Sequence, residues 1–256
     1  MKTGIYIMTS IVVAAVLLGI TVSQKKTVQP VNRISIEGKG FVLMELFTSQ
    51  GCSSCPPADE ILGNYVKQND PRIIPLSFHV DYWNRLGWVD PFSTTAFTRR
   101  QNEYGSHFNL ESVYTPQLII NGQKELVGND ETKIAALVAD EIKQKPVNVI
   151  NIVKKNITGN KIIVDYSLDV IIPNTSVYAA LVQDQVVTQI RAGENKGVQL
   201  TNYNIVRDLA NSAAVTMAGS LSLQLPSGND VRGYHVVIFL QENGPGKIIA
   251  AAVSKL

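Results

Sequence analysis

The feature that most constrains the fold is an apolar run leading into two closely spaced cysteines and then into a helical pattern. Phe41–Ser49, broken only by Glu45, is too short for a typical helix and suits a buried strand. Pro56–Gln68 predicts a helix, because prolines need no amide donor in a first turn and its apolar residues recur at helical spacing. Cys52 and Cys55 lie between the two, so the sequence predicts a strand–dithiol–helix unit.

The N-terminus carries an uncharged apolar run, Gly4–Val22, directly after a short basic end. This order is typical of an export signal, and about 19 residues is also enough to span a bilayer. Residues 1–24 are therefore expected to form a cleaved signal peptide or an uncleaved N-terminal membrane anchor, followed by a linker over 25–40; a buried core helix is the third alternative. Export would place the protein in the periplasm or another extracytoplasmic space, anchored to the inner membrane if the run is retained.

A disulfide between the two cysteines would stabilise the fold only weakly. A loop as short as C-x-x-C gains only about 2 kcal/mol of stability in the chain-entropy model, against about 4.7 kcal/mol for a loop of 100 residues. Disulfides persist outside the cytoplasm, and a cysteine just before a helix has its thiolate stabilised by the helix N-terminus. We therefore expect Cys52 to be an exposed nucleophile and Cys55 the resolving thiol, with no cofactor beyond their redox-active disulfide.

Further elements complete an α/β layout. The predicted strands and helix after the dithiol unit are the strand Arg72–Val80, the hairpin formed by Pro116–Gly122 and Lys124–Gly128, and the helix Asn129–Lys145. Alternating strands and helices of this kind predict a domain over 41–145 with a mixed sheet and an insertion at about 81–113. From Pro146 the chain is β-rich and predicts a second, sandwich-like domain over 146–256, in which Tyr203–Asn211 alone hints at a short helix.

A C-x-x-C between strand and helix, followed by Thr115-Pro116 at the start of a strand hairpin, resembles the thioredoxin superfamily. In that superfamily the proline is cis, faces the dithiol and lets the preceding backbone pair with a bound peptide, so the resemblance implies this role for Thr115 and Pro116. The alternative is an ordinary proline at a strand edge.

An acid in a buried strand is costly without a task or a partner, and Glu45 is such an acid. Thioredoxins keep a buried carboxylate on the strand before the dithiol to relay a proton to the resolving cysteine. The resemblance implies that task for Glu45. The alternative is an edge position with the side chain in water.

Four ordered stretches resemble one bacterial exported family: ELFTSQGCSSCPPAD, LSFHVDYWNRLGWVDPFSTTAFTRRQ, VYTPQLIING and GENKGVQL…NIVR. That family is catalogued only as domain of unknown function 1223, and the likeness runs from about Phe41 to the C-terminus. It implies a thioredoxin-like domain with a C-x-x-C, a β-rich C-terminal domain and no established substrate. The family often has a histidine between the GENKG and NIVR segments, and this chain has Asn202 near that place, so a ligand role for that histidine does not carry over.

His79 and Asp81 follow the second predicted strand, which should end on the same rim as the dithiol. They could exchange protons with the thiol or bind a metal; alternatively, they brace the insertion by hydrogen bonding. Arg99 and Arg100 are expected on a solvated helix face. The segment GENKG at 193–197 lacks the spacing of a phosphate-binding loop and predicts a turn.

Two functions from different classes follow. In the first, Cys52 attacks a disulfide, a mixed disulfide forms and Cys55 resolves it, which makes the protein a thiol–disulfide oxidoreductase. Its partners would be an exported protein or small-thiol substrate and a redox partner that resets the dithiol. In the second, Cys52, Cys55 and His79 bind and deliver copper(I), since thiolates suit that ion. A non-catalytic thioredoxin-like scaffold is the third alternative. The formal charge of +2 without a basic run argues against nucleic acid as a partner.

Overall fold

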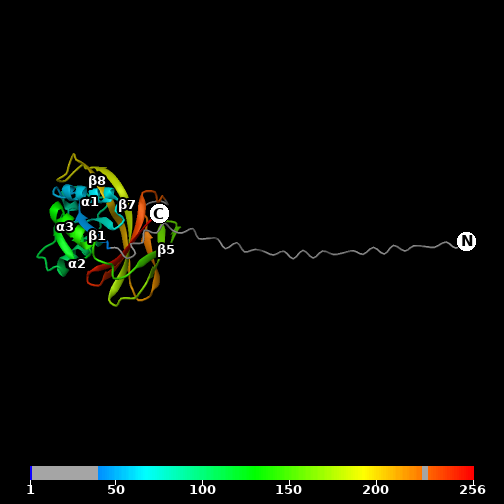
Figure 1. Cartoon of the computed structure of the whole chain (residues 1–256). Helices are drawn as coiled ribbons and strands as arrows, with labels where there is room; N and C mark the ends of the chain where they lie inside the picture. The colour runs from blue at the N-terminus through cyan, green and yellow to red at the C-terminus, as the bar shows by residue number, and fades with distance from the viewer. Residues whose placement is uncertain (2–39, 227–229) are drawn as a thin grey trace. The chain divides into compact units, whose positions relative to one another are not determined.

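The computed structural model describes Met1, residues 40–226 and residues 230–256. The chain divides into two units, Met1–Pro30 and Val31–Leu256, and the second holds the helices and strands described below (Figure 1). The predicted signal or anchor over 4–22 and most of the predicted linker lie outside the described residues. Where the chain is described, no helix is both long enough and apolar enough to cross a membrane.

The described residues form a mixed α/β fold, as the sequence predicts, with a large sheet and three α-helices. An eight-stranded sheet has the order β11-β10-β7-β8-β2-β1-β3-β4, and a three-stranded sheet has the order β5-β6-β9. The helices are α1 (Pro56–Gln68), α2 (Thr95–His107) and α3 (Glu131–Glu141), with a 3₁₀ turn at Asn84–Leu86. The strands are β1 (Val42–Thr48), β2 (Ile73–His79), β3 (Gln117–Ile120), β4 (Lys124–Val127), β5 (Ile150–Thr158), β6 (Lys161–Leu168), β7 (Thr175–Gln189), β8 (Gln199–Ala213), β9 (Ala218–Gln224), β10 (Tyr234–Glu242) and β11 (Ile248–Lys255).

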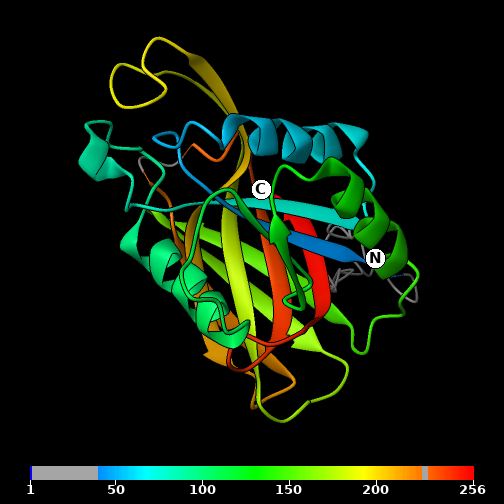
Figure 2. The same cartoon turned by 90° about the vertical axis from the view of Figure 1, so that its left-hand side faces the viewer.

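Strand β1 is buried on both faces and organises the first half of the fold. It runs parallel to β2 and antiparallel to β3, which forms a hairpin with β4. Side chains alternate between the faces of a strand. Met44 and Leu46 therefore pack with α1 and α3, whereas Leu43 and Phe47 pack on the opposite face with α2. The sheet therefore carries α1 and α3 on one face and α2 on the other (Figure 2).

The β-rich half is built as two layers. The sheet β5-β6-β9 packs its apolar face against β7, β10 and β11 in one continuous core. The larger sheet also continues into the first half, because β8 pairs in parallel with β2 at Ser77 and Ile205. Strands from either side of residue 146 thus form a single sheet.

The short helix predicted at Tyr203–Asn211 is wrong, because this segment lies within β8. A bulge in the β7–β8 pairing leaves Arg207 unpaired between Val206 and Asp208. Ile205 and Val206, just before the bulge, are adjacent and both buried, since this part of β8 is covered on both faces. This irregular apolar spacing imitates a helical pattern.

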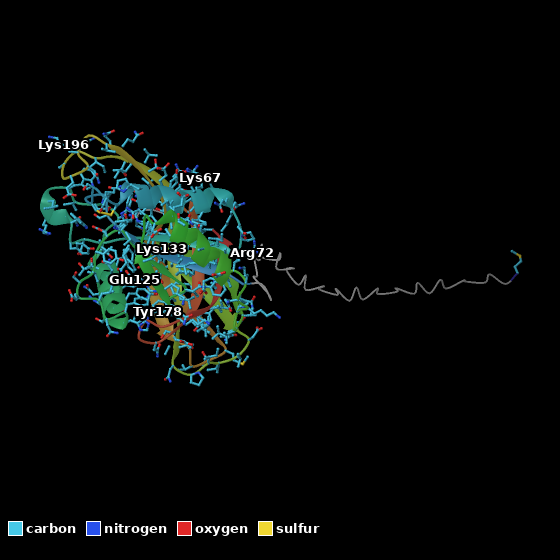
Figure 3. The ribbon with its side chains drawn as sticks, turned by 60° about the vertical axis from the view of Figure 1, so that its left-hand side comes forward. Lys67, Arg72, Glu125, Lys133, Tyr178 and Lys196 are labelled. Carbon is cyan, nitrogen blue, oxygen red and sulfur yellow. A yellow bond between two sulfur atoms is a disulfide. The ribbon has the colours of Figure 1, made fainter. Side chains whose placement is uncertain are left out.

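The long strands β7 and β8 extend beyond the sheet as a hairpin. Its tip, residues 190–198, lies near the N-terminal end of α1 and the loop that carries the cysteines (Figure 2). Lys196 belongs to this tip, and Lys67 lies on α1 (Figure 3). The hairpin thereby brings the β-rich half to the predicted site.

Candidate functional site

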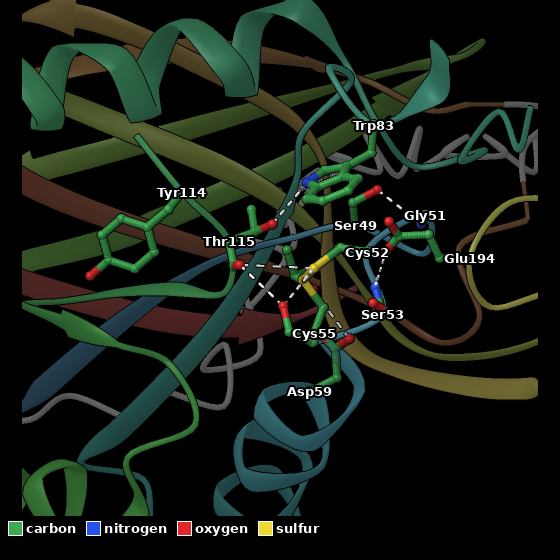
Figure 4. The surroundings of a disulfide bond; sticks show 12 residues. Ser49, Gly51, Cys52, Ser53, Cys55, Asp59, Trp83, Tyr114, Thr115 and Glu194 are labelled. Atoms are coloured by element: carbon green, nitrogen blue, oxygen red, sulfur yellow. Dashed lines mark hydrogen bonds between the residues drawn. A yellow bond between two sulfur atoms is a disulfide. The ribbon is translucent and has the colours of Figure 1, made fainter. Parts of the chain in front are cut away.

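Cys52 and Cys55 are joined by a disulfide at the start of α1, with their Cα atoms 5.5 Å apart (Figure 4). Cys55 is the N-cap residue of the helix, and its carbonyl accepts a hydrogen bond from the Ala58 amide at 2.9 Å. The next two helical residues, Pro56 and Pro57, have no amide hydrogen, so the start of the helix favours a thiolate through the positive end of its dipole and not through free amides.

The Thr115–Pro116 segment faces this disulfide, and its peptide bond is cis. Cys52 Sγ lies 3.9 Å from the Thr115 carbonyl oxygen. The Ser54 hydroxyl donates to the same carbonyl at 3.4 Å and lies 3.3 Å from Cys52 Sγ. The structure therefore brings both cysteines, Thr115 and Pro116 together, although they come from segments far apart in the sequence.

The predicted exposure of Cys52 is wrong: both cysteines have an exposed fraction of 0%. Trp83, from the insertion, donates from Nε1 to Thr115 Oγ1 at 2.8 Å. Its Cβ also packs against Gly51, because a Cβ added to this glycine would lie only 3.1 Å from the Cβ of Trp83. The hairpin tip contacts the loop from another side. We call Trp83, Glu194 and Asn195 the cover. Ser53 and Ser54 remain exposed, so the disulfide lies just beneath the surface.

Asn195 ties the hairpin tip to the cysteine loop. Its side-chain amide is buried and donates to the carbonyls of Gln50 and Cys52, each at 2.9 Å. The neighbouring Glu194 carboxylate accepts from the Ser53 amide at 3.0 Å. Hydrogen bonding by the side chain and the amide of Ser53 lowers the pKa of Glu194. The predicted turn is present, but sequence reasoning missed that Asn195 holds the loop. The available signal was that GENKG belongs to one of the four family-like stretches.

Asp59 is a second residue that sequence reasoning missed. It lies four residues after Cys55 on α1, which places both on one face of the helix. Burial raises the pKa of its carboxyl to about 7, even though His79 and a hydrogen bond from Thr48 Oγ1 at 3.2 Å act in the opposite direction. A carboxyl with this pKa can both hold and release a proton near neutral pH. The i,i+4 spacing from Cys55 was the signal in the sequence.

His79 is completely buried at the end of β2. Its Nδ1 lies 2.7 Å from Asp90 Oδ2, an atom that also accepts from the Gln50 amide at 2.8 Å. Burial by itself would lower the pKa of His79, but the charge and hydrogen bond of Asp90 raise it overall. His79 Nε2 has no hydrogen-bond partner among the described residues. These bonds brace the insertion against the cysteine loop, and the described hydrogen bonds include none from His79 to a sulfur.

Asp81 points into the insertion. Its carboxylate accepts hydrogen bonds from the hydroxyls of Thr95 and Thr98 at 2.7 and 2.6 Å, which lower its pKa. These contacts anchor the start of α2. None of the described hydrogen bonds links Asp81 to the cysteines.

Glu45 and Arg100 form a buried ion pair on the opposite face of the sheet from α1. Arg100 Nε and Nη2 lie 2.6 and 3.0 Å from the Glu45 carboxylate oxygens, and the Tyr104 hydroxyl donates to Glu45 Oε1 at 2.6 Å. The expected solvated position of Arg100 is wrong, since only 4% of it is exposed; Glu45, at 0%, does not reach water either. The guanidinium is surrounded by aromatic rings, including Tyr178 at 5.0 Å. Glu45 thus faces α2 and is not brought to the dithiol.

Copper(I) binding would require the three proposed ligands to lie together with free donor atoms. The described residues contain no group of three or more His, Cys, Asp and Glu side chains arranged to hold a metal ion. Of the three proposed ligands, two sulfurs form a disulfide and His79 Nδ1 is engaged by Asp90. In this oxidised arrangement the three do not form a ligand set.

Comparison with known proteins gives a family and two structural neighbours. The sequence model of a family described as protein of unknown function (DUF1223) matches residues 43–241. No curated protein matches the chain. A crystal structure of protein AGR_C_4864 from Agrobacterium tumefaciens is similar with a TM-score of 0.63 and 26% identity, covering 83% of this chain and 93% of that one. HBP35 of Porphyromonas gingivalis shares the fold with a TM-score of 0.56 and 15% identity, covering 86% of this chain and 76% of its own.

Proposed function

This chain belongs to the DUF1223 family of unknown function, and from its own site we propose that it exchanges thiols and disulfides through Cys52 and Cys55. The observation that carries the proposal is the placement of the disulfide at the start of α1, against the Thr115 carbonyl and the cis proline that follows it. The strand order β2-β1-β3-β4, with α1 and α3 on one face and α2 on the other, supports a thioredoxin-like arrangement.

In the proposed exchange, the reaction starts from the oxidised form. A substrate thiolate attacks Cys52 Sγ, the Cys52–Cys55 bond breaks, and a mixed disulfide forms while the Cys55 sulfur leaves as a thiolate. A second substrate thiolate then attacks the substrate sulfur of that mixed disulfide, which releases the Cys52 thiolate and leaves the substrate oxidised by two electrons. A partner disulfide must reoxidise the dithiol. The same steps in reverse reduce a substrate disulfide.

Asp59 supplies the proton chemistry of this proposal. A leaving thiolate becomes a better leaving group when a proton is available, and the Asp59 carboxyl, one helical turn from Cys55, has its pKa raised to about 7 by burial. In the oxidising direction the Asp59 carboxyl donates a proton to the Cys55 sulfur. In the reducing direction the Asp59 carboxylate accepts it. Asp59 thus takes the role that the resemblance to thioredoxins implied for Glu45.

The cover must move for the exchange to occur. Both sulfurs are buried, so a substrate sulfur approaches only when Trp83 or the hairpin tip is displaced. The exposed Ser53 and Ser54 mark the side of the loop that faces solvent. The proposed setting is outside the cytoplasm, which rests on the sequence of residues 4–22 alone.

A trapping experiment tests the proposal. The full chain carrying Cys55→Ser is oxidised with a peptide disulfide, and the mixed species is identified by mass spectrometry; Cys52→Ser is the matched variant. The proposal expects a stable mixed disulfide on Cys52 in the first variant and faster turnover of the model disulfide by the unsubstituted chain than by either variant. Equal disulfide turnover by all three chains would refute exchange through this pair.

A further inference from the structure

A cavity of about 470 Å³ lies at the opposite end of α1 from the disulfide. One wall comes from the C-terminal turn of α1 and the start of β2, and the other comes from β5, β7, β10 and β11. Cavities of this size, formed where two parts of a fold meet, are typical sites for small molecules. Neither cysteine lines the cavity, so ligand binding there can be tested independently of disulfide exchange.

The cavity forms because β2 and β8 pair over a short stretch and diverge towards the start of β2. In the described part of the chain their pairing is confined to Ser77 and Ile205. The earlier residues of β2, Ile73–Pro75, therefore face the cavity instead of β8, apart from one hydrogen bond from Asn204 Nδ2 to the Pro75 carbonyl at 2.9 Å. Ile73, Ile74 and Val253 give the cavity an apolar wall.

Lys155 supplies a positive charge to this wall. Its ammonium donates to Ser254 Oγ at 2.7 Å and to the Lys255 carbonyl, and both acceptors are neutral. No carboxylate among the described residues lies within ion-pair distance of it, whereas Asp70 is paired with Arg72 and Asp184 with His235. Partial burial lowers the pKa of Lys155. A half-buried cation without a counter-ion is costly, and an anionic ligand would remove that cost.

We infer that this cavity binds small organic carboxylates with an apolar body. The carboxylate lies against Lys155 Nζ and the body packs on Ile73, Ile74 and Val253. A carboxylate suits the ammonium better than a neutral polar group does, because only the carboxylate brings the opposite charge that a partly buried cation lacks. The apolar wall excludes ligands that are charged at both ends.

Calorimetry with the purified full chain tests the inference. The probes are 4-phenylbutyrate, its neutral analogue 4-phenylbutanol and its cationic analogue 4-phenylbutylamine, which share one apolar body. The variants are Lys155→Gln, which keeps a donor for Ser254, and Lys154→Gln, an exposed neighbour on β5 that serves as the control. Val253→Phe fills the apolar part of the cavity.

We expect 4-phenylbutyrate to bind more tightly than either analogue, and Lys155→Gln to weaken its binding about tenfold, as the loss of a hydrogen bond to a charged group does. Lys154→Gln should leave binding unchanged, and Val253→Phe should weaken all binding. Three results would overturn the inference: no binding of the acid in the millimolar range, equal binding of acid and alcohol, or unchanged affinity in Lys155→Gln. None of these bears on exchange at Cys52.

Discussion

The side-chain amide of Asn195 donates a hydrogen bond of 2.9 Å to the backbone carbonyl of Cys52, a residue 143 positions earlier in the chain. The same amide bonds the Gln50 carbonyl, so one side chain from the β7–β8 hairpin fixes two backbone groups of the cysteine loop. The β-rich half therefore contributes directly to the candidate site. It holds the backbone of the loop that carries the disulfide.

Replacing Asn195 with Ala should loosen this loop. Two buried carbonyls would lose their donor, at about 1–3 kcal/mol for each unsatisfied group. We expect a lower free energy of unfolding and faster reduction of the disulfide by dithiothreitol, measured by urea unfolding and thiol labelling. Lys196→Ala, in the exposed neighbouring position, is the control and should change neither. Unchanged reduction kinetics in Asn195→Ala would show that the hairpin does not control the reactivity of the disulfide.

Asp59 should make the stability of the oxidised protein depend on pH. Its pKa is raised from 3.8 to about 7 in the folded state, so the folded protein holds more protons than the unfolded chain between these values. Stability from this group is therefore present at low pH and lost as pH rises towards 7. The stability of the wild type relative to Asp59→Asn should fall by about 2–3 kcal/mol from pH 5 to pH 8.

Urea unfolding of both proteins across this pH range measures that difference. Glu60→Gln, an exposed carboxylate on the same helix, is the control and should track the wild type. A pH-independent difference between the wild type and Asp59→Asn would mean that Asp59 is ionised throughout. It could then not act as the proton donor to Cys55.

Trp83 should control access to the disulfide. Trp83→Ala removes both the ring and its hydrogen bond to Thr115, whereas Trp83→Phe keeps a ring and loses only the bond. We expect the rate of reaction with dithiothreitol to rise most in the Ala variant and less in the Phe variant. Val89→Ala, an exposed change in the same insertion, should leave the rate unchanged. Equal rates in all four proteins would show that the ring does not limit access.

The Glu45–Arg100 pair should matter for stability and not for exchange. Arg100→Met leaves the buried Glu45 carboxylate without its cation, and breaking a buried pair in this way costs about 3–5 kcal/mol. Arg99→Met, at the exposed neighbour, should cost less than about 0.5 kcal/mol. Denaturant unfolding measures both. The pH profile of exchange should be the same in Glu45→Gln as in the wild type; a shifted profile would restore the relay first assigned to Glu45.

The sequence predicted the local parts of this structure well and its long-range contacts poorly. The strand before the cysteines, the helix after them and the β3–β4 hairpin depend on apolar spacing, prolines and turn residues that lie within each segment. The contact of Asn195 with Cys52 depends on where a hairpin from the other half of the chain comes to lie. Local spacing near either residue does not encode this contact, and its one signal is that GENKG belongs to a family-like stretch.

Two site assignments failed for a related reason. The resemblance to thioredoxins implied a proton relay for Glu45, on the strand before the dithiol, but alternation along β1 turns it towards α2 and Arg100. The exposure of Cys52 was expected from its position before a helix, and a neighbouring insertion covers it. The direction of a side chain and its exposure to solvent follow from tertiary packing, which spacing along the chain does not specify.

The reduction potential of the Cys52–Cys55 pair tests the central claim most directly. The full chain is equilibrated in glutathione and dithiothreitol buffers, and its thiols are counted by alkylation and mass spectrometry. Reversible exchange predicts a single two-electron transition between about −120 and −270 mV, the range of proteins that exchange disulfides. A pair that stays oxidised in the folded protein to below about −300 mV, as structural disulfides do, would contradict the account.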